Sequence, residues 1–386
     1  MRILVCPLDW GLGHAGRCIP LIRALREAGH EVRIAAAEGA LRLLRGEFPD
    51  LAWDEFPGYR VRYARSAAML LPLLAVQIPA ILAGWRAEKR RLGRLVAAHP
   101  CDLVISDGRY GLAGTGIPTV LITHQIAFRL PPNLPGRKLA ERILLRLNLK
   151  ALARFERVWI PDWPVPRSLA GDLAGPSSPA GNRVWIGPLG RFAAAPAGSL
   201  PRGPRIDIAA VVSGPEPQRS LFEASLRASL ARLPGTRVLV RGLPGASGHT
   251  GPGLASIKSG ELNVFDHLPG EELAQVFAHA GALVARSGYT TVMELAVLGA
   301  AAAVLVPTPG QTEQEYLADH LSELGASVRR DQGELDLEAA IREARDLPGF
   351  RSWREDDPGG RLTRFVQSHP MLAHAPRQAV GKTGQQ

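Results

Sequence analysis

Residues 283–317, LVARSGYTTVMELAVLGAAAAVLVPTPGQTEQEYL, contain the pattern that decides the fold of this chain. A short apolar run leads through a polar turn into a helical segment, and a second apolar run leads through a turn with proline and glycine into another helix. Strands that alternate with helices in this way predict a parallel sheet covered by helices. Because ligands bind such sheets at the carboxyl ends of the strands, the two polar turns are candidate ligand sites.

The polar residues of these turns suit a nucleotide that carries phosphates. They are Arg286, Ser287, Gly288, Thr290 and Thr291 in the first turn, and Pro307, Gly310, Gln311 and Gln314 in the second. A helix that begins after Gly288 offers free N–H groups and a positive dipole end, which favour a phosphate. Glu294 lies inside the same helix, and its carboxylate could accept both hydroxyls of a ribose. A structural alternative is a capping box formed by Thr291 and Glu294.

The two turns resemble the carboxy-terminal donor domain of GT-B glycosyltransferases, in particular the family 28 N-acetylglucosaminyltransferases that make lipid-linked peptidoglycan precursors. That family holds its nucleotide sugar with an RSG-x-x-T-x-x-E element and a P-x-x-x-x-x-x-Q element, which match residues 286–294 and 307–314 here. The resemblance implies two Rossmann-like, doubly wound α/β domains that face each other across a cleft. It also implies donor contacts at Arg286, Ser287, Gly288, Thr291, Glu294, Gln311 and Gln314.

Length, charge and cysteine content narrow the class of protein. A chain of 386 residues is long enough for two domains, each with its own core. A net charge of +10 favours polyanionic partners, and because no nucleic-acid-binding signature is present, we expect phosphates and an anionic membrane surface but no nucleic acid. Three cysteines without metal-type spacing predict buried thiols of a cytoplasmic protein. The first residues enter a strand without a signal peptide's apolar region, which predicts the same location.

The amino-terminal half begins with a similar unit. The apolar run Arg2–Pro7 is followed by the loop GLGH at residues 11–14 and by a helix that ends near Gly29. No acidic residue stands where a dinucleotide ribose would bind after the next strand, so this loop does not predict an NAD site. His14 matches the glycine-rich loop that faces the acceptor in the family, while capping or solvation of the helix start is the structural alternative.

Two later strands of this half also end in polar residues. Asp107 follows one apolar run, and His124 and Gln125 follow the next. In a doubly wound sheet these strand ends share one edge with His14, so Asp107 could raise the basicity of His14 and fix its tautomer. By the resemblance, the acceptor would contact the loops of this edge at Gly11, Gly13, His124 and Gln125.

Residues 66–85, SAAMLLPLLAVQIPAILAGW, are twenty residues without a charge, flanked on both sides by basic residues. A straight helix of this length would span a membrane core of about 30 Å. Crossing would separate the strands of one sheet, and basic residues at both ends give no positive-inside asymmetry. Pro72 and Pro79 disfavour a straight helix, so we expect a kinked helical pair on one membrane leaflet, with a buried core helix as the alternative.

A second segment, residues 137–157, favours the same surface. Basic residues recur at every fourth position, namely Arg142, Arg146, Lys150 and Arg154. Apolar side chains accompany them at Leu139, Ile143, Leu147, Leu149 and Leu152. A basic amphipathic helix is typical of binding to anionic lipid, at about 1 kcal/mol per charge, although a solvated helix face has the same pattern. We expect peripheral attachment to the inner face of the cytoplasmic membrane.

The second half follows a linker rich in alanine, proline and glycine, which we expect at residues 193–204. Its first strand ends at Ser213 and Gly214, where a helix that starts near Pro217 can present N–H groups to a phosphate. The family has more glycines and fewer prolines in this loop. We expect an acceptor-binding domain over residues 1–192, a donor-binding domain over 205–369 and a disordered tail over 370–386.

Together these features predict an inverting glycosyltransferase. The donor would be a nucleoside diphosphate sugar, expected to be UDP-linked, and the acceptor a lipid-linked or polysaccharide hydroxyl of cell-envelope synthesis. His14, assisted by Asp107, would deprotonate the acceptor, while helix amino termini and Arg286 would stabilise the leaving pyrophosphate. No Asp-x-Asp motif follows a strand, so we expect no metal and no cofactor. Two alternatives use the same fold: a nucleotide-sugar hydrolase or epimerase, and a non-catalytic subunit that recruits a partner to the membrane.

Overall fold

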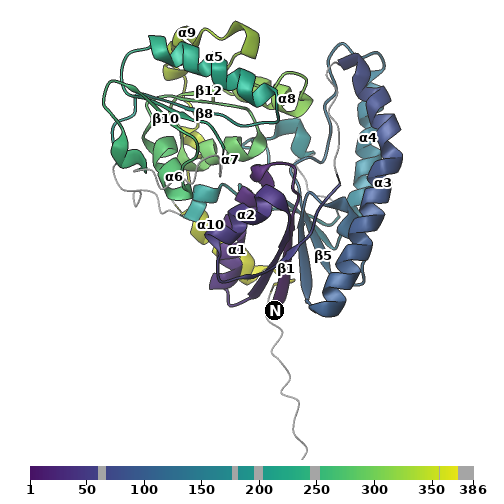
Figure 1. The fold of residues 1–386 in the computed structure, drawn as a ribbon. Helices are drawn as coiled ribbons and strands as arrows, with labels where there is room; N and C mark the ends of the chain where they lie inside the picture. The colour runs from purple at the N-terminus through teal and green to yellow at the C-terminus, as the bar shows by residue number, and fades with distance from the viewer. Residues whose placement is uncertain (60–66, 176–180, 195–202, 244–252, 356, 373–386) are drawn as a thin grey trace, which may run out of the picture.

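The computed structural model describes residues 1–59, 67–175, 181–194, 203–243, 253–355 and 357–372. They form two α/β domains, each built on one sheet, and helices pack on these sheets (Figure 1). Every pairing between named strands is parallel. The doubly wound α/β architecture expected from the sequence is therefore confirmed.

The first sheet has seven strands in the order β3-β2-β1-β4-β5-β6-β7. They are β1 (Arg2–Pro7), β2 (Glu31–Ala36), β3 (Ala52–Glu55), β4 (Leu103–Asp107), β5 (Thr119–Ile122), β6 (Arg157–Ile160) and β7 (Arg183–Trp185). The central strands β1 and β4 are apolar and almost wholly buried, as expected for parallel strands covered on both faces. The order reverses between β1 and β4, so a crevice for a ligand is expected at their carboxyl ends.

The second sheet repeats this plan with six strands in the order β10-β9-β8-β11-β12-β13. They are β8 (Ile208–Val211), β9 (Arg237–Val240), β10 (Leu262–Phe265), β11 (Leu283–Ala285), β12 (Ala303–Leu305) and β13 (Val328–Arg329). Its order reverses between β8 and β11. The predicted polar turns after β11 and β12 are therefore neighbours at one edge of the sheet, next to the turn after β8.

The named helices of the described chain connect these strands. They are α1 (Leu12–Glu27), α2 (Glu38–Glu47), α3 (Ala67–Ala98), α4 (Arg137–Leu152), α5 (Gln218–Arg232), α6 (Gly270–His279), α7 (Tyr289–Leu298), α8 (Thr312–Glu323), α9 (Leu337–Arg345) and α10 (Pro358–Ser368). The helix α10 packs against α1, although it follows the second domain in sequence (Figure 1). The expected donor domain over 205–369 thus contains a helix that belongs to the packing of the first domain.

The apolar segment 66–85 differs from the kinked helical pair that we expected. A single helix, α3, contains both Pro72 and Pro79 and continues to Ala98, because the residues after Trp85 are strong helix formers. Residues 78–80, around the second proline, are exposed, so the proline ring does not disturb a packed core there. The alternative of a buried core helix is also wrong for the described side chains, since Val76 is 77% exposed.

Helix α4 carries the predicted basic and apolar residues on its surface. The exposed apolar side chains are Leu139, Ile143, Leu147 and Leu149, whereas Leu152 belongs to the core.

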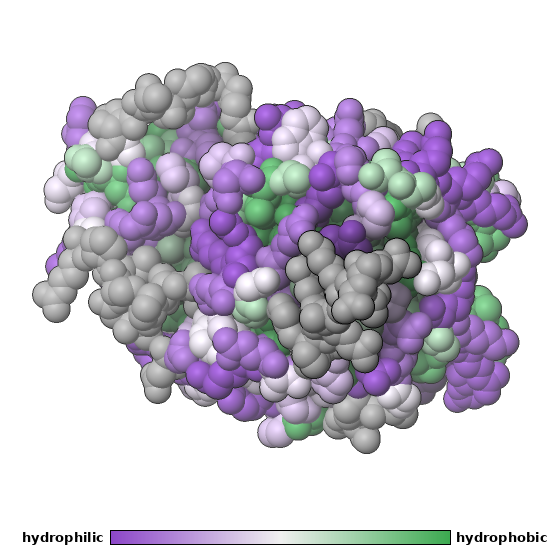
Figure 2. Space-filling model, turned by 90° about the horizontal axis from the view of Figure 1, so that it is seen from below, coloured by the Kyte–Doolittle hydropathy of each residue, from purple (hydrophilic) through white to green (hydrophobic). Residues whose placement is uncertain are grey.

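The face of the molecule seen from below is largely hydrophilic, with small hydrophobic groups between the polar side chains (Figure 2). Among the described residues, none of the helices combines the length and apolar character needed to cross a membrane.

The two domains share one apolar core and several polar contacts. Buried residues of α1 and of α7 belong to the same hydrophobic cluster. Trp353 of the second domain donates from Nε1 to the carbonyl of Arg167 of the first domain at 2.8 Å. Thr363 of α10 donates to Glu27 of α1 at 2.9 Å. Most of the expected linker, and residues 373–386 of the expected tail, lie outside the described residues.

Candidate functional site

The carboxyl edges of the two sheets approach each other at their switch points. A methyl group on Gly13, in the first turn of α1, would lie 2.8 Å from Oγ1 of Thr290, in the first turn of α7. The glycine at position 13 therefore permits the amino termini of α1 and α7 to meet. Gly11 precedes α1 with a φ of 91°, a conformation that favours glycine, and it has no neighbour within 4 Å.

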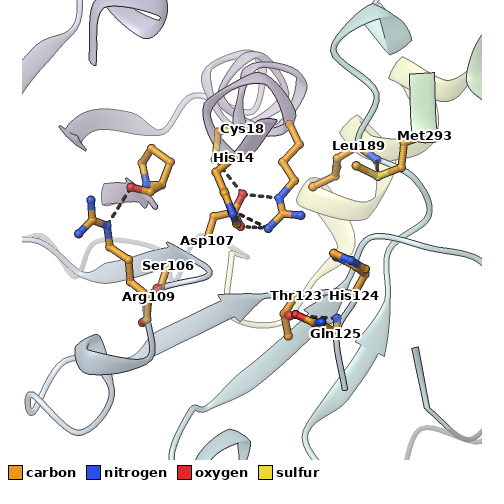
Figure 3. Close-up of polar contacts among 12 residues, drawn as sticks. His14, Cys18, Ser106, Asp107, Arg109, Thr123, His124, Gln125, Leu189 and Met293 are labelled. Carbon is orange, nitrogen blue, oxygen red and sulfur yellow. Dashed lines mark hydrogen bonds and ion pairs between the residues drawn. The ribbon is translucent and has the colours of Figure 1, made fainter. Parts of the chain in front are cut away.

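His14 and Asp107 meet at the switch point of the first sheet. His14 lies in the first turn of α1, after β1, and Asp107 is the last residue of β4. The distance between His14 Nδ1 and Asp107 Oδ1 is 3.0 Å (Figure 3). Asp107 is fully buried, whereas 24% of the His14 side chain is exposed. The structure thus brings together the two residues that we expected to be catalytic, with His14 as the one that a substrate can reach.

The sequence did not indicate that Arg17 would join this pair. Arg17 lies one turn after His14 on α1 and is buried. Its Nε donates to Asp107 Oδ2 at 2.5 Å, and its Nη2 donates to Asp107 Oδ1. The available signal was an arginine three residues after His14 on a helix that is otherwise apolar at this point, which places both on one face.

The pKa of His14 is lowered, which differs from the increase that we expected Asp107 to cause. Burial is the largest cause, and the positive charge of Arg17 is the second. Asp107 does raise the pKa of His14, but this effect is outweighed. Burial raises the pKa of Asp107, yet Arg17 and then His14 reverse this effect and hold it well below 3.8. His14 is thus an uncharged base beside a permanently ionised carboxylate.

His124 contacts the second domain directly. Its Nε2 lies 3.1 Å from Glu313 Oε1, at the start of α8, and its ring stacks on Tyr289 with centroids 3.8 Å apart. Burial raises the pKa of Glu313, but His124, followed by Arg17 and His14, lowers it further than burial raises it. Gln125 is partly exposed, and its backbone carbonyl accepts from Asn148. His124 therefore lies at the domain interface, and Gln125 remains accessible beside it.

The turn before α7 leaves its helix start open. Gly288 is the N-cap of α7, no side chain caps it, and no atom lies within 4 Å of the position where its side chain would be. The alternative of a capping box is therefore wrong, because Thr291 lies inside the helix. Ser213 and Gly214 are exposed in the turn before α5. The start of α5 itself is partly occupied, because Glu216 accepts from the backbone N–H of Ser220 at 3.2 Å and the carbonyl of Pro215 accepts from that of Arg219 at 3.0 Å. The start of α7 therefore keeps N–H groups available for an anion, whereas α5 offers mainly the turn that precedes it.

Arg286 does not point its guanidinium at these helix starts. Its side chain is buried, and Nη1 donates to the carbonyls of Val306 and Pro307 at 3.2 and 3.0 Å. Nη2 donates to the carbonyl of Gln218 at 3.0 Å and to the side chain of Gln332 at 2.5 Å. Burial lowers the pKa of Arg286 to about 10. The direct contact with pyrophosphate that we expected of Arg286 is therefore replaced by a role in joining the strand ends.

Glu294 is buried and bound by an arginine that the sequence did not identify. Arg191 donates from Nε to Glu294 Oε1 at 2.6 Å. Burial raises the pKa of Glu294 more than Arg191 lowers it. Arg191 precedes the linker, and its charge also contributes to the lowered pKa of His267, after β10. The carboxylate expected to bind a ribose therefore lies next to a cation between the domains.

The remaining residues of the expected donor site lie in the turn after β12 and beside it. Gln314 accepts from the backbone of Thr308 at 2.9 Å and donates to the side chain of Gln311 at 2.6 Å. Ser287 is buried and donates to the carbonyl of Gln314 at 2.7 Å, which joins the turns after β11 and β12. Thr291 is partly exposed in the first turns of α7. Within the described part of the chain, no group of three or more His, Cys, Asp or Glu side chains is placed to hold a metal ion.

Comparison with known proteins relates this chain to glycosyltransferases. A family model, described as the glycosyltransferase family 28 C-terminal domain, matches residues 263–349. A UDP-N-acetylglucosamine--N-acetylmuramyl-(pentapeptide) pyrophosphoryl-undecaprenol N-acetylglucosamine transferase from Bifidobacterium adolescentis is 27% identical over 332 residues, or 79% of each chain. The transferase of the same description from Histophilus somni is 41% identical over 69 residues, and this match covers only 18% of this chain and 19% of that relative. An uncharacterized glycosyltransferase from Methanosarcina acetivorans is 24% identical over 342 residues, or 84% of each chain.

Solved structures show the same overall arrangement. The spinosyn rhamnosyltransferase SpnG aligns over 96% of this chain and 97% of its own, with a TM-score of 0.61 and 17% identity. The calicheamicin glycosyltransferase CalG4 aligns over 95% and 94%, with a TM-score of 0.56 and 18% identity. At these identities the likeness concerns the fold, which is the GT-B arrangement of two Rossmann-like domains. The resemblance inferred from the two turns is confirmed.

Proposed function

We propose that this chain, a glycosyltransferase with the GT-B fold and a family 28 carboxy-terminal domain, moves a sugar from a nucleoside diphosphate sugar to a hydroxyl of a lipid-linked or polysaccharide acceptor. The observation that carries the proposal is the pair His14 and Asp107, 3.0 Å apart beside the open start of α7. The name of the Bifidobacterium adolescentis relative states a UDP-sugar and a pyrophosphoryl-undecaprenol acceptor. A UDP-sugar and a lipid-linked acceptor are therefore the first candidates.

The proposed reaction is a single displacement that inverts the anomeric carbon. Nε2 of His14 takes the proton of the acceptor hydroxyl while the oxygen of that hydroxyl bonds to the anomeric carbon. The bond from the anomeric carbon to the donor phosphate breaks at the same time, and the nucleoside diphosphate leaves with the electron pair. His14 is partly exposed, and its pKa is lowered mainly by burial, so its uncharged ring can accept this proton at neutral pH.

Negative charge develops on the leaving pyrophosphate, and the proposal assigns its stabilisation to three groups. The open start of α7 and the exposed turn of Ser213 and Gly214 before α5 offer N–H groups, and both helices contribute the positive ends of their dipoles. The proposal assigns to Arg191 the part that we first expected of Arg286, because Arg191 lies beside α7 and donates to Glu294, the carboxylate expected to bind the ribose. A ribose that binds Glu294 would release the guanidinium toward the phosphates.

The proposal also places the protein on an anionic membrane surface that carries the acceptor. Exposed apolar side chains on α3 (Val76, Ile78 and Leu82) and on α4 (Leu139, Ile143 and Leu147) support it. Exposed basic residues accompany them, namely Arg86, Lys89, Arg90 and Arg94 on α3 and Lys138, Arg142, Arg146 and Lys150 on α4. Apolar contact combined with basic charge is the mode by which peripheral proteins bind anionic lipid.

The proposed reaction is tested by replacing His14 and measuring sugar transfer. The purified protein is screened against UDP-, GDP- and dTDP-sugars by thermal shift, and the donor that binds is assayed with lipid-linked and polysaccharide acceptors by mass spectrometry. We expect His14→Gln to lower kcat by about 10²–10⁴-fold while donor binding is retained. The matched control is His99→Gln, an exposed histidine after α3, which should leave kcat unchanged.

Three results would contradict the proposal. Release of free sugar in the absence of any acceptor would favour the hydrolase. Interconversion of the donor sugar without transfer would favour the epimerase. Failure of every nucleotide sugar to bind, together with unchanged membrane recruitment in the His14→Gln variant, would favour the non-catalytic subunit.

A further inference from the structure

Three charged or titratable side chains meet at the ends of β1 and β4, and the proposed reaction uses only two of them. Arg17 is the third, with a side chain that is 4% exposed. Arg17 donates two hydrogen bonds to Asp107, one from Nε to Oδ2 at 2.5 Å and one from Nη2 to Oδ1. The same Nη2 lies 2.9 Å from His14 Nδ1. A single guanidinium therefore touches both the carboxylate and the imidazole.

These contacts decide which nitrogen of His14 carries the proton. If Nδ1 is protonated, it donates to Asp107 Oδ1 at 3.0 Å and leaves Nε2 free to accept a proton. If Nδ1 is unprotonated, it accepts from Arg17 Nη2 instead, and Nε2 carries the hydrogen. Arg17 Nη2 carries two hydrogens, so it keeps its bond to Asp107 Oδ1 in both cases. The first arrangement, in which the ionised carboxylate holds the Nδ1 hydrogen, is the one that a base at Nε2 requires.

The charges around the pair determine whether the ring itself becomes positive. The groups that face His14 are Arg17 and Cys18 on α1, Asp107 on β4, His124 after β5 and Glu313 on α8. Asp107 alone would attract a proton to His14, because an opposite charge within about 4–6 Å favours the charged form. Arg17 offsets that negative charge at direct contact distance. The buried Arg17 and Asp107 together are neutral, so an imidazolium gains little from them.

We propose that Arg17 is a positioning residue that neutralises Asp107 and thereby keeps His14 uncharged, with Nε2 free to accept the acceptor proton. The proposal rests on the role of His14 in the proposed function. It differs from a simple pair of His and Asp, in which the carboxylate stabilises the imidazolium. Here the carboxylate of Asp107 orients the ring of His14. Arg17 keeps this ring from becoming protonated before the acceptor binds.

The test compares the pH dependence of kcat/KM in the wild type, Arg17→Gln and Arg17→Lys. The acidic limb is the part of the profile in which kcat/KM falls as the pH is lowered. Loss of the positive charge in Arg17→Gln should move this limb to higher pH by about 1–3 pH units. Activity that the variant loses at neutral pH should therefore return in alkaline solution. Arg17→Lys retains the charge and should shift the limb less. If kcat/KM falls equally at every pH and the limb stays in place, the role of Arg17 is only structural and the proposal is overturned.

Two further variants keep the test decisive if Arg17→Gln folds poorly. Arg17→Gln combined with Asp107→Asn removes both charges, so the limb should return toward its wild-type position. Arg33→Gln is the matched control, since Arg33 binds Asp54 through two bonds in the same sheet, at 2.5 and 3.2 Å, away from His14. It should leave the limb where it is. If the acidic limb of the double variant lies at the same high pH as that of Arg17→Gln, the charge argument is contradicted.

An NMR titration separates this proposal from the proposed function. The imidazole signals of His14, assigned by their loss in His14→Gln, give its pKa without any turnover. An upward shift of this pKa in Arg17→Gln supports the role of Arg17 even if sugar transfer is never detected. Unchanged titration of His14 in a folded Arg17→Gln protein overturns it, even if His14→Gln proves inactive.

Discussion

Asp107 links the candidate site to the stability of the fold. Its carboxylate is fully buried, and Arg17 and His14 hold its pKa well below 3.8 in the folded protein. A carboxyl group with a depressed folded pKa stabilises the fold above its unfolded pKa, and this stability is lost as the pH falls through the folded value. The same charge that orients His14 thus makes the protein sensitive to acid.

We therefore expect the free energy of unfolding to decrease as the pH falls below 3.8. In the Arg17→Gln/Asp107→Asn double variant, which lacks this titrating pair, the decrease over the same range should be smaller. Urea unfolding followed by circular dichroism at a series of acidic pH values measures both slopes. Equal slopes for the two proteins would show that folding does not lower the pKa of Asp107.

Arg286 gives a second prediction at the scale of one residue. It donates to three backbone carbonyls and to Gln332, and it lies 3.9 Å above the ring of Phe222. Arg286→Met should lower the free energy of unfolding by about 3 kcal/mol, because buried carbonyls lose charged donors. Arg342→Met is the control: this arginine is exposed and pairs only with Glu338 across one helical turn, so its loss should change stability by less than about 0.5 kcal/mol. If Arg286→Met has normal stability but no longer binds the donor, this result would support the direct phosphate contact that we first expected of Arg286.

The sequence predicted where these residues lie better than what they touch. Arg286 and Glu294 were placed at a strand end and in a helix because local periodicity determines both. Their partners could not be predicted, since Gln332 and Arg191 are brought near only by the packing of distant elements. Arg17 could have been found from its spacing to His14, but its bonds to Asp107 depend on a strand some ninety residues later in the chain.

At the scale of an element, Gly288 provides a test of whether the start of α7 binds the donor, as proposed. Gly288 has a φ of −66°, which any residue can adopt, and no neighbour within 4 Å. Gly288→Ala should therefore leave the melting temperature nearly unchanged. Its methyl group would nevertheless occupy the space in front of the α7 N–H groups, so donor binding should weaken by about tenfold or more, or about 1.4 kcal/mol.

Isothermal titration of the donor and thermal unfolding measure these two effects separately. The control is Gly93→Ala in the middle of α3, another glycine with no neighbour within 4 Å. It should stabilise its helix by about 0.5–1 kcal/mol and leave donor affinity unchanged. If Gly288→Ala binds the donor as the wild type does, the phosphate does not lie at the start of α7.

The helices α3 and α4 provide the prediction for the membrane. Leu139, Ile143 and Leu147 recur at every fourth position of α4 and are 62%, 47% and 58% exposed. Replacing all three with serine should reduce cosedimentation with phosphatidylglycerol vesicles by about tenfold or more, because each buried apolar side chain contributes about 1.5–3 kcal/mol. High salt should weaken binding further in both proteins. Leu221→Ser/Leu324→Ser, at two exposed leucines of the second domain, should bind as the wild type does; equal loss in this control would contradict a role specific to α4.

The sequence predicted helical structure in both segments, and the residues of each helix explain one detail that it did not predict. The two prolines suggested a break in α3, but the helix continues through both, and the strong helix formers after Trp85 extend it to Ala98. In α4, Leu152 fitted the apolar stripe, yet it packs in the core beside Phe155 because the helix ends there and the chain turns toward β6. Periodicity predicts one face of a helix, whereas burial along its length depends on what it packs against.

At the scale of the whole molecule, the second domain is joined to the first by more than the linker. Helix α10 packs on α1, and Arg361 of α10 donates to the carbonyl of Pro188 at 2.9 Å. The sequence predicted two domains of the same type, because the strand pattern occurs twice. It could not predict that the last helix returns to the first domain, since an amphipathic helix fits either surface. The two domains are therefore held together by contacts whose partners lie far apart in the chain.

Between the domains, the contacts of His124 should control how readily the two domains separate. Its Nε2 lies 3.1 Å from Glu313 Oε1, its ring stacks on Tyr289, and the hydroxyl of Tyr289 donates to the carbonyl of Pro161 at 2.9 Å. Opening must break these contacts, so His124→Ala and Glu313→Ala should each increase the radius of gyration measured by small-angle X-ray scattering and weaken donor binding. Because the two residues contact each other, the double variant should show a coupling of about 0.5–3 kcal/mol in donor affinity. Strictly additive effects would mean that His124 and Glu313 act on the donor separately and that this contact does not hold the cleft closed.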